Sequence, residues 1–90
     1  MIFKFKSMIT RPELEEAQFA LLITDGQTGH VLTKDLQIYR NDGKEIYQVF
    51  NSIESVNDYI KKIQAENDAL EFSIYSGDYV LIDFRKSSKW

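Results

Sequence analysis

The stretch from Asp35 to Phe84 constrains the fold most, because the spacing of its apolar residues changes twice. Alternating segments, typical of strands, stand on either side of one segment with helical spacing at about 52–66. This order predicts a β-hairpin, a helix and a second β-hairpin. The arrangement uses most of the large apolar side chains for a core and leaves few for chemistry.

The helix is indicated by apolar residues that share one face and by polar residues at both ends. The inward residues, spaced i, i+3, i+7 and i+10, are Ile53, Val56, Ile60 and Ile63. Asn51 or Ser52 can accept a hydrogen bond from an unpaired N–H of the first turn. Asn67 and Asp68 tolerate the left-handed conformation that ends many helices. The apolar face is too short for a coiled coil, so we expect it to face the core.

A first hairpin is predicted from two alternating segments, 35–40 and 44–50, around Asp42 and Gly43. Asp-Gly is a strong hairpin signal, because glycine adopts the positive φ that the turn requires. A three-residue loop with a bulge at Gly43 is the alternative, and it exchanges the faces of one strand. We expect the two-residue loop, which gathers four apolar residues and an ion pair on one face. It pairs Leu36 with Val49, Ile38 with Tyr47, and Arg40 with Glu45.

A second hairpin is predicted from strands over 70–75 and 79–84 with a turn at 76–78. The first of these strands alternates apolar and polar residues, as a half-buried strand does. The stretch from Tyr79 to Ile82 is apolar on both faces. This indicates either a central strand covered on both sides or a contact between subunits.

The N-terminal third permits two interpretations. Residues 2–6 alternate in the manner of a strand, and Pro12–Glu16 resembles one turn of helix. A strand over 18–24 then follows, with a loop over 25–29. The alternative is a helix that runs on to Leu22, since a short apolar run fits both structures. We choose the strand.

Together these segments predict an α+β fold, with a mostly antiparallel sheet of five or six strands and one main helix (about 52–66) packed on one face. Ninety residues fit one domain, 1–90, with a mobile basic tail over 85–90. The chain has no cysteine, which excludes disulfides and thiolate chemistry and fits a reducing compartment. There is no apolar leader and no run long enough to cross a bilayer, so we expect a cytoplasmic protein without membrane partners.

Charge is distributed unevenly along the chain. Residues 12–84 contain all fourteen acidic residues and five basic ones, a net charge of −9, whereas 1–11 and 85–90 contain three basic residues each. The acidic part is either a solvated surface or a face that attracts a basic partner. The basic ends, with Trp90, suggest single-stranded nucleic acid as a further ligand. A pI near 5.0 argues against nucleic acid.

Candidate chemistry is sparse. His30 is the only histidine, so a zinc site of the usual kind is excluded, and a loop position beside glycine is typical of a turn residue. Asp25 with Asp42 or Asp78 could form a carboxylate pair, but each stands beside a glycine, where aspartate is common in turns. The segment 26–29 has two glycines but lacks the Lys-Ser/Thr ending of a phosphate loop. We therefore predict no catalytic residue, cofactor or metal ligand, and no enzyme.

The function predicted is a small protein-binding module, an inhibitor or immunity-type protein that uses an acidic face bearing tyrosines. The predicted contact residues are Tyr39, Tyr47, Tyr75, Glu45 and Glu71. Tyrosine suits such a surface because its ring is apolar and its hydroxyl stays hydrated. The alternative is a ligand-binding or enzymatic subunit whose site is completed across a homodimer.

Overall fold

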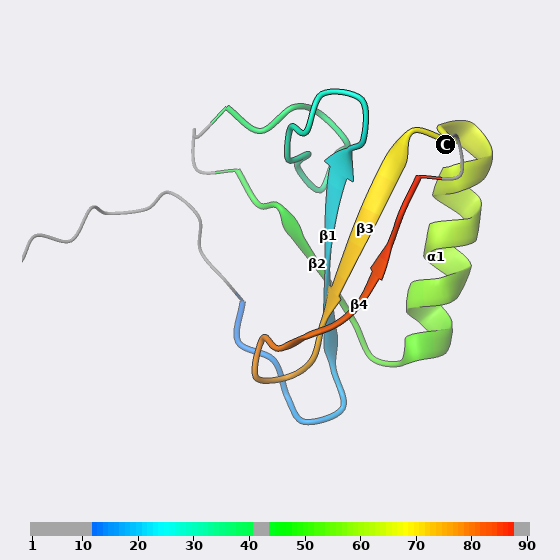
Figure 1. Cartoon of the computed structure of the whole chain (residues 1–90). Coiled ribbons are helices and arrows are strands. Elements are labelled where there is room, and N and C mark those ends of the chain that lie inside the picture. Colours follow the sequence, from blue (N-terminus) through cyan, green and yellow to red (C-terminus); the bar gives the residue numbers. More distant parts are fainter. Residues whose placement is uncertain (1–11, 41–43, 88–90) are drawn as a thin grey trace, which may run out of the picture.

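The computed structural model describes residues 12–40 and 44–87. It is an α+β structure in which one helix packs against an antiparallel sheet of four strands in the order β2-β1-β3-β4 (Figure 1). The elements are β1 (Phe19–Asp25), β2 (Tyr47–Phe50), α1 (Ile53–Glu66), β3 (Leu70–Tyr75) and β4 (Leu81–Arg85). The predicted fold class is confirmed, but the predicted five or six strands are not. The strand predicted over residues 2–6 lies outside the described residues.

Helix α1 occupies the segment that its spacing predicted. Ser52 is the cap: its hydroxyl oxygen accepts a hydrogen bond from the N–H of Ser55 at 3.1 Å. At the other end the N–H of Asn67 donates to the carbonyl of Ile63 at 2.9 Å. Asn67 has φ −149°, so the left-handed ending is wrong, and the helix ends by passing into extended backbone.

The core lies between α1 and one face of the sheet. Its buried members are Leu21, Ile23, Leu32, Val56, Ile60, Ile63, Leu70, Phe72 and Ile74. On β3 the buried residues alternate with half-buried ones, as predicted. Ile53, predicted to face inward, is 38% exposed because it is the first residue of α1 and stands at the end of the buried face.

Strand β1 confirms the strand prediction for 18–24 and excludes the alternative helix. Its apolar run is explained by its neighbours, since β2 pairs with it on one side and β3 on the other. The helical turn predicted for Pro12–Glu16 is wrong. That segment is irregular and ends in a turn closed by the N–H of Gln18, which donates to the carbonyl of Glu15 at 2.9 Å.

The first hairpin is wrong in both registers. Tyr47–Phe50 pairs with β1, where Phe50 lies opposite Phe19 and Tyr47 opposite Leu22. Segment 35–40 forms only an isolated bridge between Ile38 and Leu32, and the Asp-Gly turn lies outside the described residues. The local turn signal did not decide the pairing, because β1 also pairs with β3, and pairing with β1 makes β2 part of a four-stranded sheet rather than of an isolated hairpin.

The second hairpin is confirmed, and β3 and β4 pair antiparallel. Its turn is longer than predicted, with Tyr75 opposite Leu81, and the register shifts between Ile74 and Tyr75. Strand β4 stands at one edge of the sheet and its apolar residues are exposed, so the prediction of a central strand is wrong. Of the residues that the structure describes, none belongs to a helix with both the length and the apolar character needed to cross a membrane.

Candidate functional site

Three tyrosines meet on the face of the sheet opposite α1. Tyr47 belongs to β2, Tyr75 ends β3, and Tyr79 lies in the turn before β4. The ring centroids are separated by 6.1 Å for Tyr47–Tyr75, 5.6 Å for Tyr47–Tyr79 and 6.1 Å for Tyr75–Tyr79. The two contacts of Tyr47 are edge-to-face, with interplanar angles of 76°, an arrangement that aromatic pairs favour. We call these residues the tyrosine cluster.

The sheet register explains why two strands that do not pair bring their tyrosines together. Across β1, Tyr75 lies opposite Ala20 and Tyr47 lies opposite Leu22. Paired residues project to the same side of a sheet, so all four share the face away from the core. Ala20 has only a methyl group, which leaves room above β1, and it is fully buried there. A small residue at the centre of the sheet therefore permits the rings to meet.

The third tyrosine ties the chain before β1 to the site. The hydroxyl of Tyr79 donates a hydrogen bond to the carbonyl of Pro12 at 2.6 Å. A Cβ added to Gly77 would lie 3.2 Å from the carbonyl oxygen of Glu15, so this segment also lies against the turn between β3 and β4. Tyr79 itself has φ +59°, in the left-handed region that is unfavourable for a residue with a side chain. Its ring and hydroxyl contacts hold it there.

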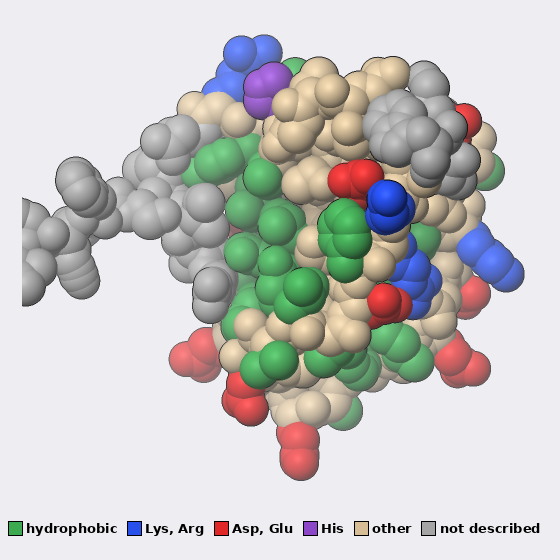
Figure 2. Space-filling model, viewed as in Figure 1, with side chains coloured by type: hydrophobic (Ala, Val, Ile, Leu, Met, Phe, Trp, Pro, Cys, Tyr) green, Lys and Arg blue, Asp and Glu red, His purple; other side chains and the backbone are tan. Residues whose placement is uncertain are grey.

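Four carboxylates border the tyrosine cluster at this end of the molecule. Glu13, Glu15, Glu16 and Asp78 are all exposed, and the packing of the N-terminal segment on the turn brings them to one side. We call these four residues the acidic rim. Figure 2 shows acidic side chains along the lower border of an apolar patch. An apolar surface with a charged border is the usual anatomy of a protein–protein contact.

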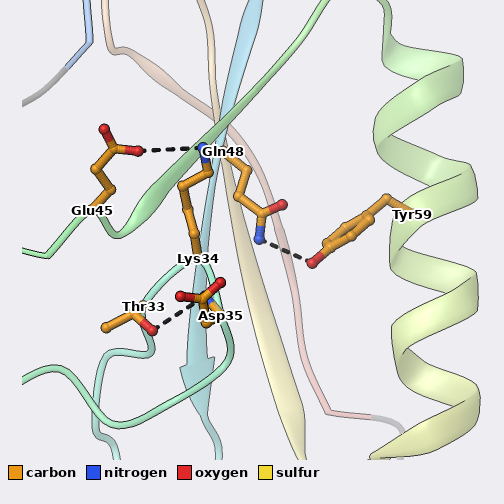
Figure 3. Close-up of polar contacts among 6 residues, drawn as sticks. All are labelled: Thr33, Lys34, Asp35, Glu45, Gln48 and Tyr59. Atoms are coloured by element: carbon orange, nitrogen blue, oxygen red, sulfur yellow. Dashed lines mark hydrogen bonds and ion pairs between the residues drawn. The ribbon is translucent and has the colours of Figure 1, made fainter.

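A depression of about 330 Å³ adjoins the cluster on the β2 side. Pro12, Tyr47 and Val49 supply its apolar wall, and Lys34 with Glu45 supplies its polar wall. The ammonium of Lys34 lies 3.3 Å from the carboxylate of Glu45 (Figure 3), and both side chains are largely exposed. The two charges offset one another, so the depression presents an apolar wall beside a neutralised pair.

On the other side of β2, Gln48 faces α1. Its amide nitrogen donates to the hydroxyl of Tyr59 at 2.9 Å (Figure 3), and the ring of Tyr59 packs on Phe50 with centroids 5.4 Å apart. Tyr59 therefore belongs to the contact between helix and sheet. It provides a tyrosine with a structural role for comparison with the cluster.

The structure brings together some of the predicted contact residues. Tyr47 and Tyr75 are in the tyrosine cluster, and Glu45 lines the depression beside them. Glu71 is on the same face of β3 as Tyr75, where its carboxylate accepts from the N–H of Ser87 at 3.4 Å. Tyr39 is in a different segment.

Tyr39 and Tyr79 are the two tyrosines whose positions differ from the predicted contact set. The N–H of Tyr39 donates to the carbonyl of Val31 at 2.8 Å, and Val31 bridges to Thr24, so Tyr39 lies near the C-terminal end of β1 rather than in the predicted first hairpin. Tyr79, absent from the predicted contact set, completes the cluster. Its position directly after Gly77-Asp78 was a signal, since a residue that follows a turn can lie close to the strand before it.

His30 and Asp25, weighed for catalysis, flank the turn that follows β1. The ring nitrogen Nδ1 of His30 lies 2.9 Å from the hydroxyl of Thr28, and the carboxylate of Asp25 accepts from the N–H of Gln27 at 2.9 Å. Asp25 and Asp78 lie at opposite ends of the sheet, so they do not form a carboxylate pair. Within 12–40 and 44–87, no three histidine or acidic side chains are grouped so as to hold a metal ion.

Comparisons with models of protein families, with curated proteins and with solved structures found no match to this chain.

Proposed function

We propose that this chain is a protein-binding module that holds a basic protein partner on the tyrosine cluster. The observation that carries the proposal is the meeting of Tyr47, Tyr75 and Tyr79 beside four exposed carboxylates. Aromatic side chains supply much of the binding energy in many interfaces, and charges at the border set association rate and partner choice. An inhibitor or immunity-type protein that neutralises a basic partner fits this arrangement.

The shape of the surface favours a protein over a small molecule. The depression of about 380 Å³ beside Tyr79 is open to solvent, and the one of about 330 Å³ beside Tyr47 is only partly enclosed. Small-molecule sites enclose most of the ligand surface within a concave pocket. The charges of Lys34 and Glu45, 3.3 Å apart, also offset one another, so this pair would attract a charged small molecule only weakly.

The mode of binding follows from the side chains. The three rings pack against one another, so little of their rotational freedom is left to lose when a partner docks. The acidic rim would attract lysine and arginine side chains around the apolar contact. Because the rim is exposed, salt screens it strongly, and the association rate should fall as ionic strength rises.

The test is capture of the partner followed by titration of the purified complex. The full chain is immobilised, a lysate of its source is applied at low salt, and bound proteins are eluted with a salt gradient and identified. The dissociation constant of the purified partner is then measured for the unmodified chain, for Tyr47→Ala and for Tyr59→Phe. Tyr59 is the matched control, since its hydroxyl accepts from Gln48 on the helix side.

We expect one basic protein to elute at moderate salt and Tyr47→Ala to weaken its binding at least about ten-fold, with Tyr59→Phe unchanged. Replacing Glu13, Glu15 and Glu16 by glutamine should reduce the salt dependence of the association rate. Nucleic acid in the eluate would contradict the proposal and favour the basic ends. A captured protein that binds Tyr47→Ala as tightly as the unmodified chain would also contradict it.

A further inference from the structure

We propose that a second copy of this chain pairs with the outer edge of β4, so that two four-stranded sheets join into one. β4 is the last strand in the order β2-β1-β3-β4, and of the residues that the structure describes only those of β3 form a ladder with it. An open strand edge presents backbone N–H and C=O groups that another strand can bind. The inference rests on the backbone edge and charges of β4 and on no contact of the tyrosine cluster, so it does not depend on the proposed function.

The side chains at this edge are unusually apolar for an exposed strand. Leu81, Ile82 and Phe84 are 51%, 48% and 47% exposed, and Val80 just before the strand is 58% exposed. By contrast, every second residue of β3 is buried. Proteins usually protect an open edge with charges or proline, and a long apolar edge otherwise promotes association.

The two charged residues of β4 indicate which partner fits. Asp83 lies opposite Ile74, and Arg85 opposite Phe72, so both project toward the side of α1. They remain accessible because α1 approaches β1 and β2 most closely and leaves the edge strand uncovered. Their side chains form an exposed ion pair at 2.8 Å within one chain. One acid and one base, two residues apart, make this edge complementary to itself.

Symmetry then selects the register. When the two copies cross antiparallel with Phe84 opposite Phe84, Asp83 of each copy lies opposite Arg85 of the other. The next register in one direction sets Asp83 against Asp83, and the next in the other direction sets Arg85 against Arg85. Opposite charges directly across from each other stabilise a strand pair and like charges destabilise it. Only the register centred on Phe84 brings together two pairs of opposite charge.

In this dimer the two-fold axis runs through the sheet at Phe84. Such an axis keeps corresponding faces on the same side, so both helices cover one face and both tyrosine clusters lie on the other. Phe84 is opposite Ser73, on the face of the cluster. A strand of five residues makes a small contact, so we expect a dimer that dissociates on dilution.

The test is sedimentation velocity of the full chain over a concentration series, with charge-reversal variants. Asp83→Arg and Arg85→Asp each place like charges across the two-fold axis, so each alone should weaken the dimer at least about ten-fold. Mixed one to one, the two variants are complementary and should form a heterodimer. The double variant D83R/R85D should restore the dimer. Glu54→Arg, an exposed reversal on α1, is the control and should leave it unchanged.

Phe84→Lys provides a second probe, since it sets two ammonium groups against each other at the axis, and circular dichroism checks that every variant is folded. A single monomeric species at all concentrations would overturn the proposal. So would a dimer that Asp83→Arg and Arg85→Asp do not weaken. A monomeric full chain that dimerises only after removal of residues 1–11 would show instead that those residues cover the edge.

Discussion

The hydroxyl of Tyr79 and the carbonyl of Pro12 form a 2.6 Å hydrogen bond between residues 67 positions apart. This bond joins the segment before β1 to the turn after β3 and places the acidic rim beside the tyrosine cluster. It therefore connects the fold to the proposed binding surface.

Tyr79→Phe removes this hydrogen bond and keeps the ring. We expect a loss of about 0.5–1.5 kcal/mol in the free energy of unfolding, because the part-buried carbonyl of Pro12 loses its donor. Urea denaturation measures the change. Tyr75→Phe is the matched control, since among the described residues no hydrogen bond to its hydroxyl is found, and it should change stability little. Equal losses for the two variants would contradict the role given to Tyr79.

Phe72→Ala should destabilise the protein more than any change at the surface of the sheet. Phe72 is fully buried under α1, so the loss should be about 3–5 kcal/mol from burial and the cavity together. If this variant does not fold, Ile74→Val gives a smaller step of about 0.5–1.5 kcal/mol. Phe84→Ala, at 47% exposure, is the control. In dilute solution, where any dimer is dissociated, a large loss for Phe84→Ala would contradict the exposed position of β4.

Ser52→Ala tests the helix cap. The hydroxyl oxygen of Ser52 accepts from the N–H of Ser55, so its removal should cost about 1 kcal/mol of unfolding free energy. Ser55→Ala keeps that N–H and loses only the hydroxyl that accepts from Ser52, so its effect should be small. Circular dichroism with urea denaturation compares the two. An unchanged midpoint for Ser52→Ala would assign the cap to another group.

Gly26→Ala tests the close approach of the loop after β1 to β3. A Cβ at Gly26 would lie 2.6 Å from the carbonyl oxygen of Ala69, which also accepts the N–H of Gly26 at 2.7 Å. The backbone must shift, at a cost of about 1–3 kcal/mol. Gly29→Asn is the control, because φ there is +79° with open space around it, and asparagine tolerates that conformation. Thermal denaturation should show a clearly larger loss for Gly26→Ala.

The local patterns predicted α1 and the β3–β4 hairpin correctly. In α1 every inward residue and the cap lie within a few positions of one another, so the spacing contains the information. In the hairpin the two strands are joined by a short turn, so pairing partners are close in sequence. Where a contact joins distant residues, these patterns failed, as they did for β2.

In the candidate site, too, local patterns predicted the residues whose positions depend on near neighbours, and they failed for contacts between distant segments. Alternation along β3 predicted that Tyr75 faces away from the core, and this is confirmed. That Tyr47 lies beside it depends on β1, which stands between β2 and β3 and carries Ala20 at the crossing point. Tyr39 belongs to the predicted set as a tyrosine on the predicted strand 35–40, and it lies apart from the cluster because that segment forms only an isolated bridge to Leu32.

The sequence by itself determined the helix, the alternation of β3 and the separation of acidic from basic residues, whereas for β1 it permitted both a strand and a helix. The tertiary structure decided the order of the strands, the edge position of β4 and the meeting of Tyr47, Tyr75 and Tyr79. The physical reason is the range of the interactions. Periodicity, capping and turns act between near neighbours, whereas strand order depends on which distant apolar partners together bury the most surface.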